Sequence, residues 1–462
     1  MRTIVVGAGP AGVRAVEQLV TAGLRPVWID EAPDGGGRIY QRPPLGLTRD
    51  HRQLYGMEAG RARAVHDTLD ALKSRTDWRP NTLVWHIDPH NRTLETLCAG
   101  QQATLTYDNA ILCTGAMDRV IPLPGWTRPG VTTLGGAQIA LKAQGCAIGQ
   151  HVALVGTGPL LWLLAYQYLK NGARPVAVID TTSFAHKARH AAALLPGGTV
   201  FWKGLWYMAA VRAAGTPVFE GARPVAITGS GDEVKAITFK TASGATRQIT
   251  CDAVALGWGL KPEAQLADLA GVPFHFDEPQ HNWVPEKDAT GRTKVPAIYL
   301  AGDGAGIAGA DAAEMAGARA ALALLEDAGR TVPGPLTATL DGALARLSGF
   351  RATLERAFPF PADLARAMPD DTLVCRCEAI SAGDLRAVGG RPATGAAPEL
   401  NRAKAFTRLG MGRCQGRVCG PAGAEILATA LGRDVAAIGR LRGQPPVKPV
   451  PLASATVQEA AE

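Results

Sequence analysis

The stretch Ile4-Val5-Val6-Gly7-Ala8-Gly9-Pro10-Ala11-Gly12 decides the fold of this 462-residue chain. Its three apolar residues predict a short buried strand, and the apolar spacing after Gly12 predicts a helix. Gly7 permits a sharp exit from the strand, Gly9 lets a pyrophosphate approach the backbone, and Gly12 lets helix and strand pack closely. The free N–H groups at the start of the helix would face the phosphates. We therefore predict a dinucleotide-binding unit with the contact residues Gly7, Gly9, Pro10, Ala11 and Gly12.

Two acidic residues follow the next predicted strand, which covers residues 27–29. Asp30 and Glu31 come directly after it, and a carboxylate at this place can accept hydrogen bonds from the ribose hydroxyls. Glu31 lies 24 positions after Gly7, and the same spacing recurs in a second unit farther along the chain. This match favours Glu31 over Asp30 as the ribose ligand. We also expect Arg38 to contact the cofactor.

The second unit begins at residue 151. A predicted strand runs into Gly156-Thr157-Gly158-Pro159-Leu160-Leu161, and the strand at residues 176–179 ends at Asp180, 24 positions after Gly156. Leu161 stands where the third glycine would be, so helix and strand cannot approach as closely. The sequence leaves open whether Gly156, Gly158 and Asp180 bind a nucleotide or have a structural role only.

Two later strands complete the first unit. Residues 110–116 form an apolar strand that breaks at Thr114-Gly115, and residues 298–300 form another that runs into Gly302-Asp303. A helix then begins at Gly309-Ala310. The Asp303 carboxylate could accept a hydrogen bond from a ribityl chain, with the helix N-terminus facing a flavin ring. An ordinary N-capping role for Asp303 is the alternative.

Together these segments resemble the flavoproteins with two dinucleotide-binding domains of the glutathione and thioredoxin reductase type. The resemblance implies an FAD domain at residues 1–115 and 290–330, with an NAD(P)-like domain inserted at residues 116–289. Residues 255–262 look like the segment that returns to the FAD domain. No Cys-x-x-Cys pair precedes residue 375, so the dithiol chemistry of the disulfide reductases is absent. We expect the four scattered cysteines to be core residues: Cys98, Cys113, Cys146 and Cys251.

The other four cysteines form two close pairs. Cys375 and Cys377 are separated by one residue, and Cys414 and Cys419 by four. A C-x-C pair suits one iron of a two-iron cluster, whereas structural zinc favours C-x₂₋₄-C pairs. Each pair also precedes a predicted helix start, whose N–H groups would offset the charge of thiolates. We expect a [2Fe–2S] cluster on these four residues, and zinc or unligated thiols are the alternatives.

Residues 373–378 and 410–421 resemble the [2Fe–2S] domain of bacterioferritin-associated ferredoxins. The C-x₄-C variant looks like the form fused to flavoprotein subunits of amino-acid and opine dehydrogenases. Nearly the whole chain resembles the alpha subunits of the opine oxidase, hydroxyproline and proline dehydrogenase group, which is related to cyanide-forming glycine oxidation and to the sarcosine oxidase alpha subunit. The predicted fold is α/β, with two nested Rossmann-like domains, a linker and helix at residues 331–370, a small helical [2Fe–2S] domain at 371–435 and an extended tail at 436–462. Within residues 331–370 we expect the linker to cover residues 331–336.

This resemblance implies an electron-transfer flavoprotein subunit of a heteromeric amino-acid or opine dehydrogenase. In the complexes that it resembles, a beta subunit of the D-amino-acid oxidase type removes hydride from a secondary amine or amino acid. Electrons then pass through flavin and the [2Fe–2S] cluster toward a respiratory acceptor. The resemblance also leaves room for FMN at a subunit interface, a small third subunit, and ATP or NAD in place of FAD.

We find no general base for substrate oxidation in the chain and name no catalytic residue. His51, His86 and His281 are isolated in the sequence and are expected to be surface or structural residues. The alternatives are an NAD(P)H oxidoreductase that needs no partner, with nicotinamide at Gly156, and a scaffold whose nucleotide never changes its redox state.

The composition narrows the class of protein. Hydrophobic residues make up 47% and charged residues 19%, which excludes a disordered chain, and the net charge of +7 is modest. No interleaved basic and aromatic pattern indicates nucleic-acid binding. No signal peptide or apolar run of about 20 residues is present, so we expect a cytoplasmic protein, with peripheral contact at the inner membrane left open. Residues 201–207, Phe-Trp-Lys-Gly-Leu-Trp-Tyr, are expected to form a local core patch, with a ligand or partner contact as the alternative.

Overall fold

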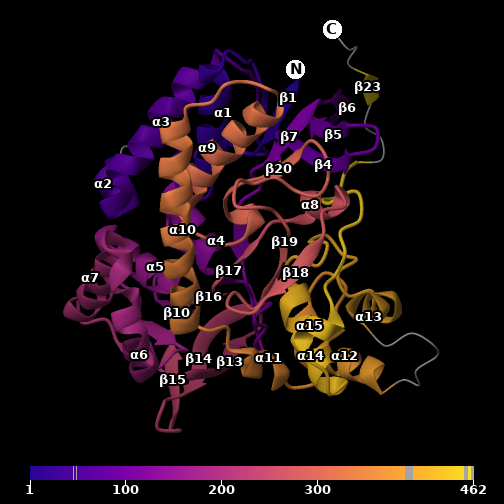
Figure 1. Cartoon of the computed structure of the whole chain (residues 1–462). Helices are drawn as coiled ribbons and strands as arrows, with labels where there is room; N and C mark the ends of the chain where they lie inside the picture. The colour runs from indigo at the N-terminus through magenta and orange to yellow at the C-terminus, as the bar shows by residue number, and fades with distance from the viewer. Residues whose placement is uncertain (45, 48, 391–398, 452–455, 459–462) are drawn as a thin grey trace.

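The computed structural model of the chain describes residues 1–44, 46–47, 49–390 and 399–451, together with the backbone of residues 456–458. Two parallel sheets, each packed against helices, and a small unit of short helices make up the molecule (Figure 1). In Figure 1 the first sheet lies at the top, the second at the lower left and the helical unit at the lower right.

The first sheet has the strand order β20-β7-β1-β2-β3, and every neighbouring pair is parallel. Alternate side chains of its central strand face opposite sides: Val5 packs toward helices, while Ile4 and Val6 pack toward a second, antiparallel sheet. Both faces are therefore buried, as parallel sheets require. Its strands are β1 (Thr3–Val6), β2 (Val27–Ile29), β3 (Asp77–Arg79), β7 (Asn109–Leu112) and β20 (Ile298–Leu300).

Helices cover one face of this sheet and an antiparallel sheet covers the other. The helices are α1 (Pro10–Thr21), α3 (Ala59–Lys73) and α9 (Ala310–Asp327), with the short α2 (His51–Tyr55) beside α3. The antiparallel strands are β4 (Thr82–Asp88), β5 (Thr93–Cys98) and β6 (Gln101–Thr106), and β23 (Thr456–Gln458) adds to β6 in parallel.

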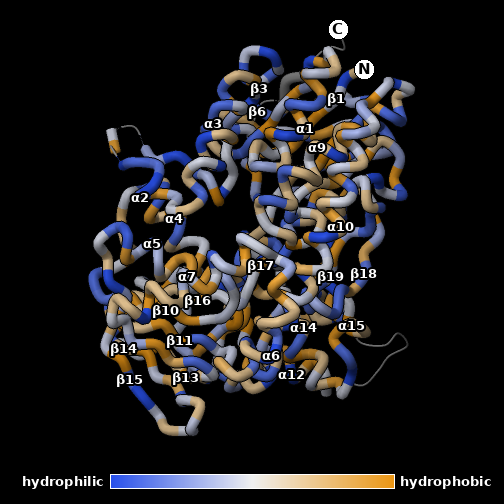
Figure 2. Tube along the Cα trace, turned by 60° about the vertical axis from the view of Figure 1, so that its left-hand side comes forward, coloured by the Kyte–Doolittle hydropathy of each residue, from blue (hydrophilic) through white to orange (hydrophobic). Residues whose placement is uncertain are grey.

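The second parallel sheet has the order β12-β11-β10-β16-β9. Figure 2 colours β10, β11 and β16 as largely hydrophobic, which fits strands that are buried on both faces. Its strands are β9 (Val131–Thr133), β10 (Val152–Thr157), β11 (Ala177–Asp180), β12 (Val218–Glu220) and β16 (Ala253–Trp258). The elements around it are α4 (Leu134–Ala143), α5 (Pro159–Lys170), α6 (Phe184–Leu194), α7 (Thr199–Ala213), β13 (Arg223–Ser230), β14 (Glu233–Lys240) and β15 (Thr246–Thr250).

The chain leaves the first unit and returns to it through one pair of strands. β8 (Ala116–Asp118) follows β7, and β17 (Leu260–Pro262) follows β16 and pairs with β8 in antiparallel. The helix α8 (Gln265–Leu269) and the hairpin of β18 (Phe274–Asp277) and β19 (Asn282–Pro285) then lead back to β20.

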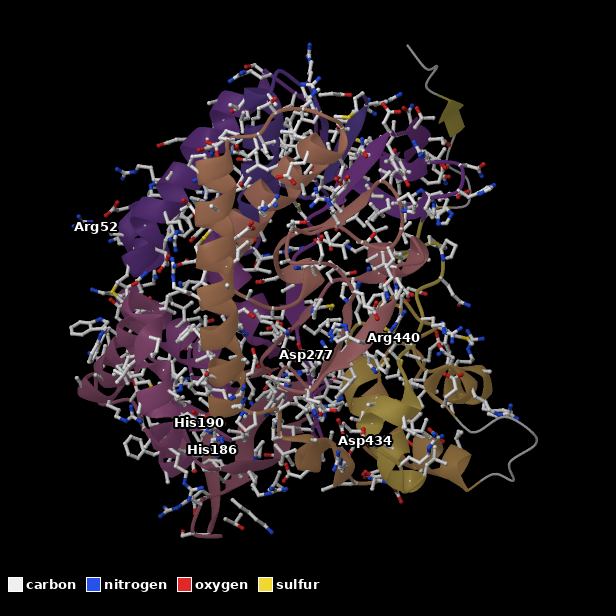
Figure 3. All side chains as sticks on the ribbon, viewed as in Figure 1. Arg52, His186, His190, Asp277, Asp434 and Arg440 are labelled. Carbon is white, nitrogen blue, oxygen red and sulfur yellow. The ribbon has the colours of Figure 1, made fainter. Side chains whose placement is uncertain are left out.

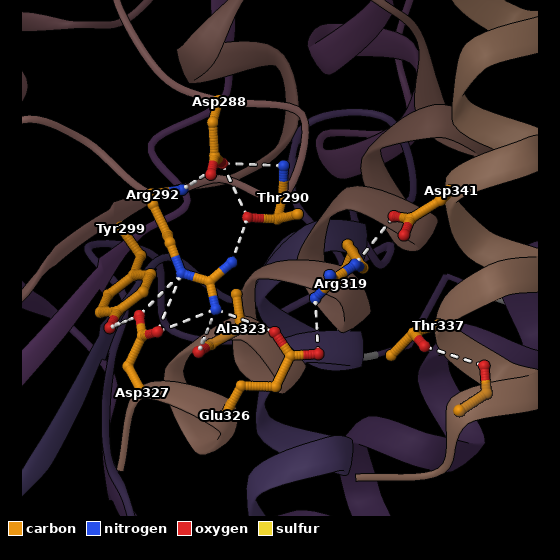
Figure 4. A network of polar contacts seen from close by, with 11 residues as sticks. Asp288, Thr290, Arg292, Tyr299, Arg319, Ala323, Glu326, Asp327, Thr337 and Asp341 are labelled. Carbon is orange, nitrogen blue, oxygen red and sulfur yellow. Dashed lines mark hydrogen bonds and ion pairs between the residues drawn. The ribbon is translucent and has the colours of Figure 1, made fainter. Parts of the chain in front are cut away.

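A polar network fixes this returning segment to the end of α9 (Figure 4). The Arg292 guanidinium, just before β20, donates hydrogen bonds to both Asp327 oxygens and to Glu326. The Tyr299 hydroxyl also donates to Asp327, at 2.7 Å. Arg319 on α9 forms an ion pair with Asp341 on α10 (Gly334–Ala357), so the network also joins α9 to α10.

The helical unit shares a hydrophobic core with the second parallel sheet. Val155 and Leu256 of that sheet belong to the same buried cluster as Val374, Leu385 and Ile426. The unit contains α11 (Ala362–Arg366), β21 (Leu373–Cys375), β22 (Ile380–Ser381), α12 (Ala382–Gly389), α13 (Leu400–Thr407), α14 (Cys419–Ala430) and α15 (Val435–Ile438). After α15 the chain runs back to the first unit, where Lys448 contacts Glu31.

Three local predictions are wrong. Cys98 and Cys146 are exposed rather than core residues, because Cys98 ends β5 at a turn and Cys146 lies in the loop after α4; Cys113 and Cys251 are buried. The linker expected at residues 331–336 is shorter, because α10 already begins at Gly334 with a proline in its first turn. The aromatic run at residues 201–207 is not a core patch, because Trp202 and Trp206 are exposed.

Candidate functional site

The first glycine-rich loop lies between β1 and α1. Gly9 is the N-cap residue of α1, Pro10 opens the helix, and no acidic side chain occupies the first turn. A Cβ atom at Gly12 would overlap the carbonyl oxygen of Gly7, so only glycine allows this close approach of helix and strand. The helix N-terminus therefore presents backbone N–H groups and a partial positive charge without an internal anion.

A second glycine loop faces the first and was not predicted. Gly35, Gly36 and Gly37 follow β2, and the N–H group of Gly36 donates to the carbonyl of Ala8 at 2.7 Å. A Cβ atom at Gly37 would lie 2.9 Å from the Cα atom of Gly9, so the two loops approach each other too closely for a side chain at Gly37. The three consecutive glycines in the sequence were the signal that could have predicted this loop. Arg38, the next residue, is exposed, and its charge acts on Asp30.

The register of β1 and β2 corrects the choice between the two acids. Val6 pairs with Ile29, which places Gly7 opposite Asp30. In the second unit Gly156 likewise pairs with Asp180. Asp30 is thus the structural equivalent of Asp180. Glu31 and Asp180 have the same sequence distance from their first glycines, but they do not have the same position in the strand register. The argument that favoured Glu31 was wrong for this reason.

The environments of the two acids also differ. Asp30 accepts hydrogen bonds from the N–H groups of Ala8 and Ala32 at 2.5 and 2.7 Å. Burial raises the pKa of Asp30 and outweighs these hydrogen bonds, which lower it. Glu31 is exposed and contacts Lys448 of the C-terminal segment. Asp30 is therefore held in a defined orientation, and Glu31 lies at the surface next to the tail.

The ends of β7 and β20 lie beside the first loop. Gly302 follows β20 and leaves no room for a side chain, because a Cβ atom there would lie 2.8 Å from that of Ala11. Asp303 accepts hydrogen bonds from the N–H groups of Ala308 and Gly309 at 2.8 and 2.9 Å, just before Ala310 opens α9. One Asp303 oxygen thus holds the two residues that precede α9, but the N-cap residue of α9 is Gly309 and no side chain caps this helix, so Asp303 is not its N-capping residue. The Thr114 hydroxyl donates to the carbonyl of Glu263, and Gly115 has a φ of +73°.

The glycine-rich motif of the second nucleotide unit, residues 156–161, lies in a different environment. Gly158 is the N-cap residue of α5, but Asp180 is completely buried and its carboxylate binds the Lys187 ammonium at 2.6 Å. The Trp162 indole N–H also donates to Asp180, at 3.2 Å. The strand-end carboxylate of this unit is therefore already used within the protein.

The four C-terminal cysteines come from two loops that lie side by side. Cys375 ends β21, Cys377 follows it, and Cys419 opens α14. Side-chain contacts connect Cys375 with Cys419, Cys419 with Cys414, and Cys414 with Cys377. A Cβ atom at Gly412 would overlap that of Cys377, so the loops meet closely. Within the described residues, no three His, Cys, Asp or Glu side chains are arranged as a single-ion metal site.

Electrostatics favour thiolates at two of these positions. Hydrogen bonding from Cys419 lowers the pKa of Cys375 to about 6 and that of Cys414 to about 5. Donation to these two sulfurs raises the pKa of Cys419 well above its ordinary value, and burial raises the pKa of Cys377. Backbone N–H groups also donate to Cys375 and Cys414. Four neighbouring thiols, of which Cys375 and Cys414 have lowered pKa values, form a ligand set that fits an iron–sulfur cluster.

One ion pair connects the two candidate sites, and sequence reasoning missed it. Arg417, in the loop between Cys414 and Cys419, binds both oxygens of Glu263 at 2.6 and 3.0 Å. The backbone N–H group of Glu263 donates to the carbonyl of Gly115. The cluster loop is thus attached to the end of β7 in the first unit. No local pattern indicates this pair, because its members are 154 positions apart.

A second contact joins the helical unit to the β18–β19 hairpin. Glu425 on α14 is buried and binds Arg366 at 2.8 Å, and His281 contacts its other oxygen. Burial alone would raise the pKa of Glu425. The contacts with His281 and Arg366 together outweigh burial, so the pKa of Glu425 lies below its ordinary value. His281 is therefore a structural residue, as expected, and the hairpin brings it to a helix 144 positions away.

We expect Glu425→Gln to lower the midpoint of thermal unfolding at pH 7 by about 3 °C, because it removes the buried charge that pairs with Arg366. The folded pKa of Glu425 is below its ordinary value of 4.5, so the pair stabilises the folded chain above about pH 4.5 and this stabilisation is lost as the pH falls through the folded pKa. The difference between the two proteins should therefore shrink at low pH. Glu233→Gln, at an exposed pair with Lys235, is the control, and an equal difference at pH 7 and pH 4 would contradict the assignment.

The comparisons with known proteins agree with this arrangement. A family model described as pyridine nucleotide-disulphide oxidoreductase matches residues 1–318, and one described as a BFD-like [2Fe-2S] binding domain matches residues 373–429. The chain is 35% identical to the A subunit of opine oxidase from Rhizobium meliloti, over 97% of this chain and 86% of that relative. The chain belongs to the family of opine oxidase A subunits, within the pyridine nucleotide-disulphide oxidoreductases.

Two further matches extend over nearly the whole chain. Hydrogen cyanide synthase subunit HcnB of Pseudomonas aeruginosa is 31% identical over 98% of each protein. The crystal structure of L-proline dehydrogenase from P. horikoshii has a TM-score of 0.71 at 18% identity and covers 98% of this chain and 78% of that one, which shows a shared fold. The predicted fold class and the resemblance named from the sequence are therefore confirmed.

The same comparisons confirm the predicted cofactor types. This member of the opine oxidase family is an oxidoreductase with an FAD-type dinucleotide-binding region and a [2Fe–2S] domain. No helix in the described part of the chain is both long enough and apolar enough to cross a membrane.

Proposed function

We propose that this chain is the electron-transferring alpha subunit of a heteromeric dehydrogenase that oxidises a secondary amine or amino acid. The observation that carries this proposal is the Glu263–Arg417 pair, which attaches the four-cysteine loop to the end of β7 beside the first nucleotide loop. The names of the relatives support it, since both the opine oxidase relative and hydrogen cyanide synthase HcnB are named as subunits.

In this proposal FAD binds at the first nucleotide unit. Gly7, Gly9 and Gly12 let the pyrophosphate approach the start of α1, and Asp30 orients the ribose, with Glu31 and Arg38 at the surface nearby. ATP or NAD at the same loop would use the same phosphate contacts. The remaining proposed contacts are Pro10, Ala11, Thr114, Gly115, Gly302, Asp303, Gly309 and Ala310.

The four cysteines would hold the cluster. When bound, flavin can exchange electrons in pairs or singly and a [2Fe–2S] cluster exchanges them only singly, so the two groups together convert a two-electron transfer into one-electron transfers. Arg417 contributes by keeping the cluster loop in place, because it also donates to the carbonyl of Val447 at 2.5 Å. The Lys261 ammonium lies close enough to interact with the charges of Cys414 and Cys419.

Substrate oxidation would take place in a partner. We name no catalytic base in this chain, and we propose a beta subunit of the D-amino-acid oxidase type that carries the substrate site. An FMN at the subunit interface and a small third subunit would fit the same scheme, and a respiratory carrier would take the electrons.

Anaerobic rapid mixing tests this function. The chain is purified alone and together with its partner subunit, and each is mixed with candidate amines while visible and EPR spectra are recorded. We expect reduction of the flavin and of the iron–sulfur signal only in the complex. Oxidation of an amine by the isolated chain, or a chromophore that is never reduced in an active complex, would contradict the proposal. The second result would favour a scaffold.

The Asp180–Lys187 pair makes a prediction about the rival NAD(P)H function. Because the Asp180 carboxylate is buried and paired, it cannot accept the ribose hydroxyls of a nicotinamide nucleotide. We expect NADH and NADPH, each added alone without oxygen, to leave the flavin absorption of the holoprotein unreduced. Dithionite, which needs no binding site, is the positive control. Bleaching by either nucleotide would instead support an oxidoreductase that needs no partner.

A further inference from the structure

Two lysines near the cysteine loops have no carboxylate bound to them. Lys404 on α13 is buried, and Lys261 on β17 is only partly exposed. The Lys404 ammonium donates to the neutral amide oxygen of Gln444 at 3.1 Å, and within the described residues the Lys261 ammonium has no hydrogen bond or ion pair. Lysines with little access to water normally have an acidic partner. These two ammonium groups therefore lack a counter-charge.

The carboxylates whose charges reach the two lysines are already paired with arginines. Glu263, which acts on Lys261, binds Arg417 through both oxygens at 2.6 and 3.0 Å. Asp268, which acts on the other lysine, accepts hydrogen bonds from Arg440 at 2.6 Å on each oxygen. Figure 3 shows Arg440 where the β18–β19 hairpin meets the helical unit. Neither carboxylate is thus available as the partner of a lysine.

The cysteine sulfurs are the other negative groups within reach. The charge of Cys419 acts on both Lys261 and Lys404, and the charge of Cys414 also acts on Lys261. Lys404 reaches this place because α13 packs against α14, which Cys419 opens. A cluster on these cysteines would therefore have an ammonium group nearby from the helical unit.

The other ammonium group comes from the returning segment, whose position is fixed by direct contacts. The side-chain amide of Gln265, at the start of α8, donates to the carbonyl of Gln415 at 2.7 Å. Gln415 lies in the loop between Cys414 and Cys419. Lys261, four positions before Gln265, lines a cavity of about 120 Å³ together with Gln415. The returning segment thus holds Lys261 against the cluster loop.

We propose that Lys261 and Lys404 supply counter-charge to the [2Fe–2S] cluster and so raise its reduction potential. The inference deepens the proposed function, because it rests on the four cysteines being the cluster ligands. Reduction by one electron adds one negative charge to such a cluster, so a nearby cation stabilises the reduced form more than the oxidised form. The two lysines act through their charge and bind neither iron nor substrate.

A potentiometric titration of the holoprotein, followed by the EPR signal of the reduced cluster, tests this role. Dithionite supplies the electrons and ferricyanide removes them. Lys261→Met and Lys404→Met each remove one charge and keep a long unbranched side chain. We expect each variant to shift the one-electron equilibrium toward the oxidised cluster at least about threefold. The double variant should shift it about tenfold, which lowers the midpoint potential by about 59 mV.

Two further variants separate charge from packing. Lys261→Arg keeps the charge and has room in the cavity, so its midpoint potential should equal that of the natural chain. Lys240→Met, at an exposed lysine on β14, should also leave the potential unchanged. An unchanged potential in the double variant with its full iron content would overturn the proposal. Loss of iron from both Lys261→Met and Lys261→Arg would show a packing role and also overturn it, whereas loss from Lys261→Met alone would support the role of the charge.

The titration needs neither an amine nor a partner subunit, so its result is separate from the test of the proposed function. A lowered potential in the lysine variants, together with a natural complex whose flavin and cluster no amine reduces, would contradict the proposed function alone. An unchanged potential in an active complex would contradict the role of the lysines alone.

Discussion

Replacement of Cys414 by serine is expected to lower the iron and acid-labile sulfide content of the purified chain at least about tenfold, because a hydroxyl is a poor ligand for a [2Fe–2S] cluster. Cys414 lies at the centre of the site: it contacts both Cys377 and Cys419, and its pKa is lowered to about 5. The backbone N–H groups of Gly416 and Val418 donate to its sulfur. Loss of this thiolate therefore removes the best-stabilised ligand.

Metal analysis, sulfide determination and the EPR spectrum of the reduced protein measure this effect. Cys98→Ser is the matched control, because Cys98 is a free, exposed cysteine on β5, away from the helical unit. Its iron content should equal that of the natural chain. Full iron content in Cys414→Ser, or one zinc in place of iron in both proteins, would rule out the assigned ligand set.

Gly9→Ala is expected to lower the nucleotide content at least about tenfold while the protein stays folded, because a methyl group would occupy the approach of the pyrophosphate. The protein itself leaves room for this methyl group: a Cβ atom at Gly9 would lie 3.6 Å from its nearest neighbour, the Cα atom of Gly37. Gly9 also has a φ of −75°, which alanine adopts without strain. The variant therefore separates nucleotide binding from packing.

Nucleotide released on denaturation, together with the thermal unfolding midpoint of the nucleotide-free protein, measures the two effects separately. Gly60→Ala is the control, since Gly60 is exposed on α3 and a Cβ atom there would have no neighbour within 4 Å, and it should keep its nucleotide. Gly12→Ala should differ from both, because its Cβ atom would overlap the Gly7 carbonyl and destabilise the fold. Full nucleotide content in Gly9→Ala would show that the phosphates bind elsewhere.

Much of the candidate site could be predicted because it is built from contiguous residues. A glycine loop between a strand and a helix has the same backbone geometry wherever the pattern occurs, so residues 4–12 predicted both the fold and the place of the phosphates. Two cysteine pairs with tight spacing likewise indicated a ligand set before any contact was known. The wrong choice of Glu31 shows the limit, because strand register depends on pairing and not on counting residues.

The sequence by itself thus determined the two nucleotide-type units, the [2Fe–2S] domain and their order along the chain, since each depends on local backbone conformation. Only the tertiary structure decided which partners each side chain meets. It placed Lys187 on Asp180, Arg417 on Glu263, and Trp202 and Trp206 at the surface. The physical reason is that ion pairing and burial depend on segments far apart in the chain, and helical spacing alone does not say which face of α7 will be covered.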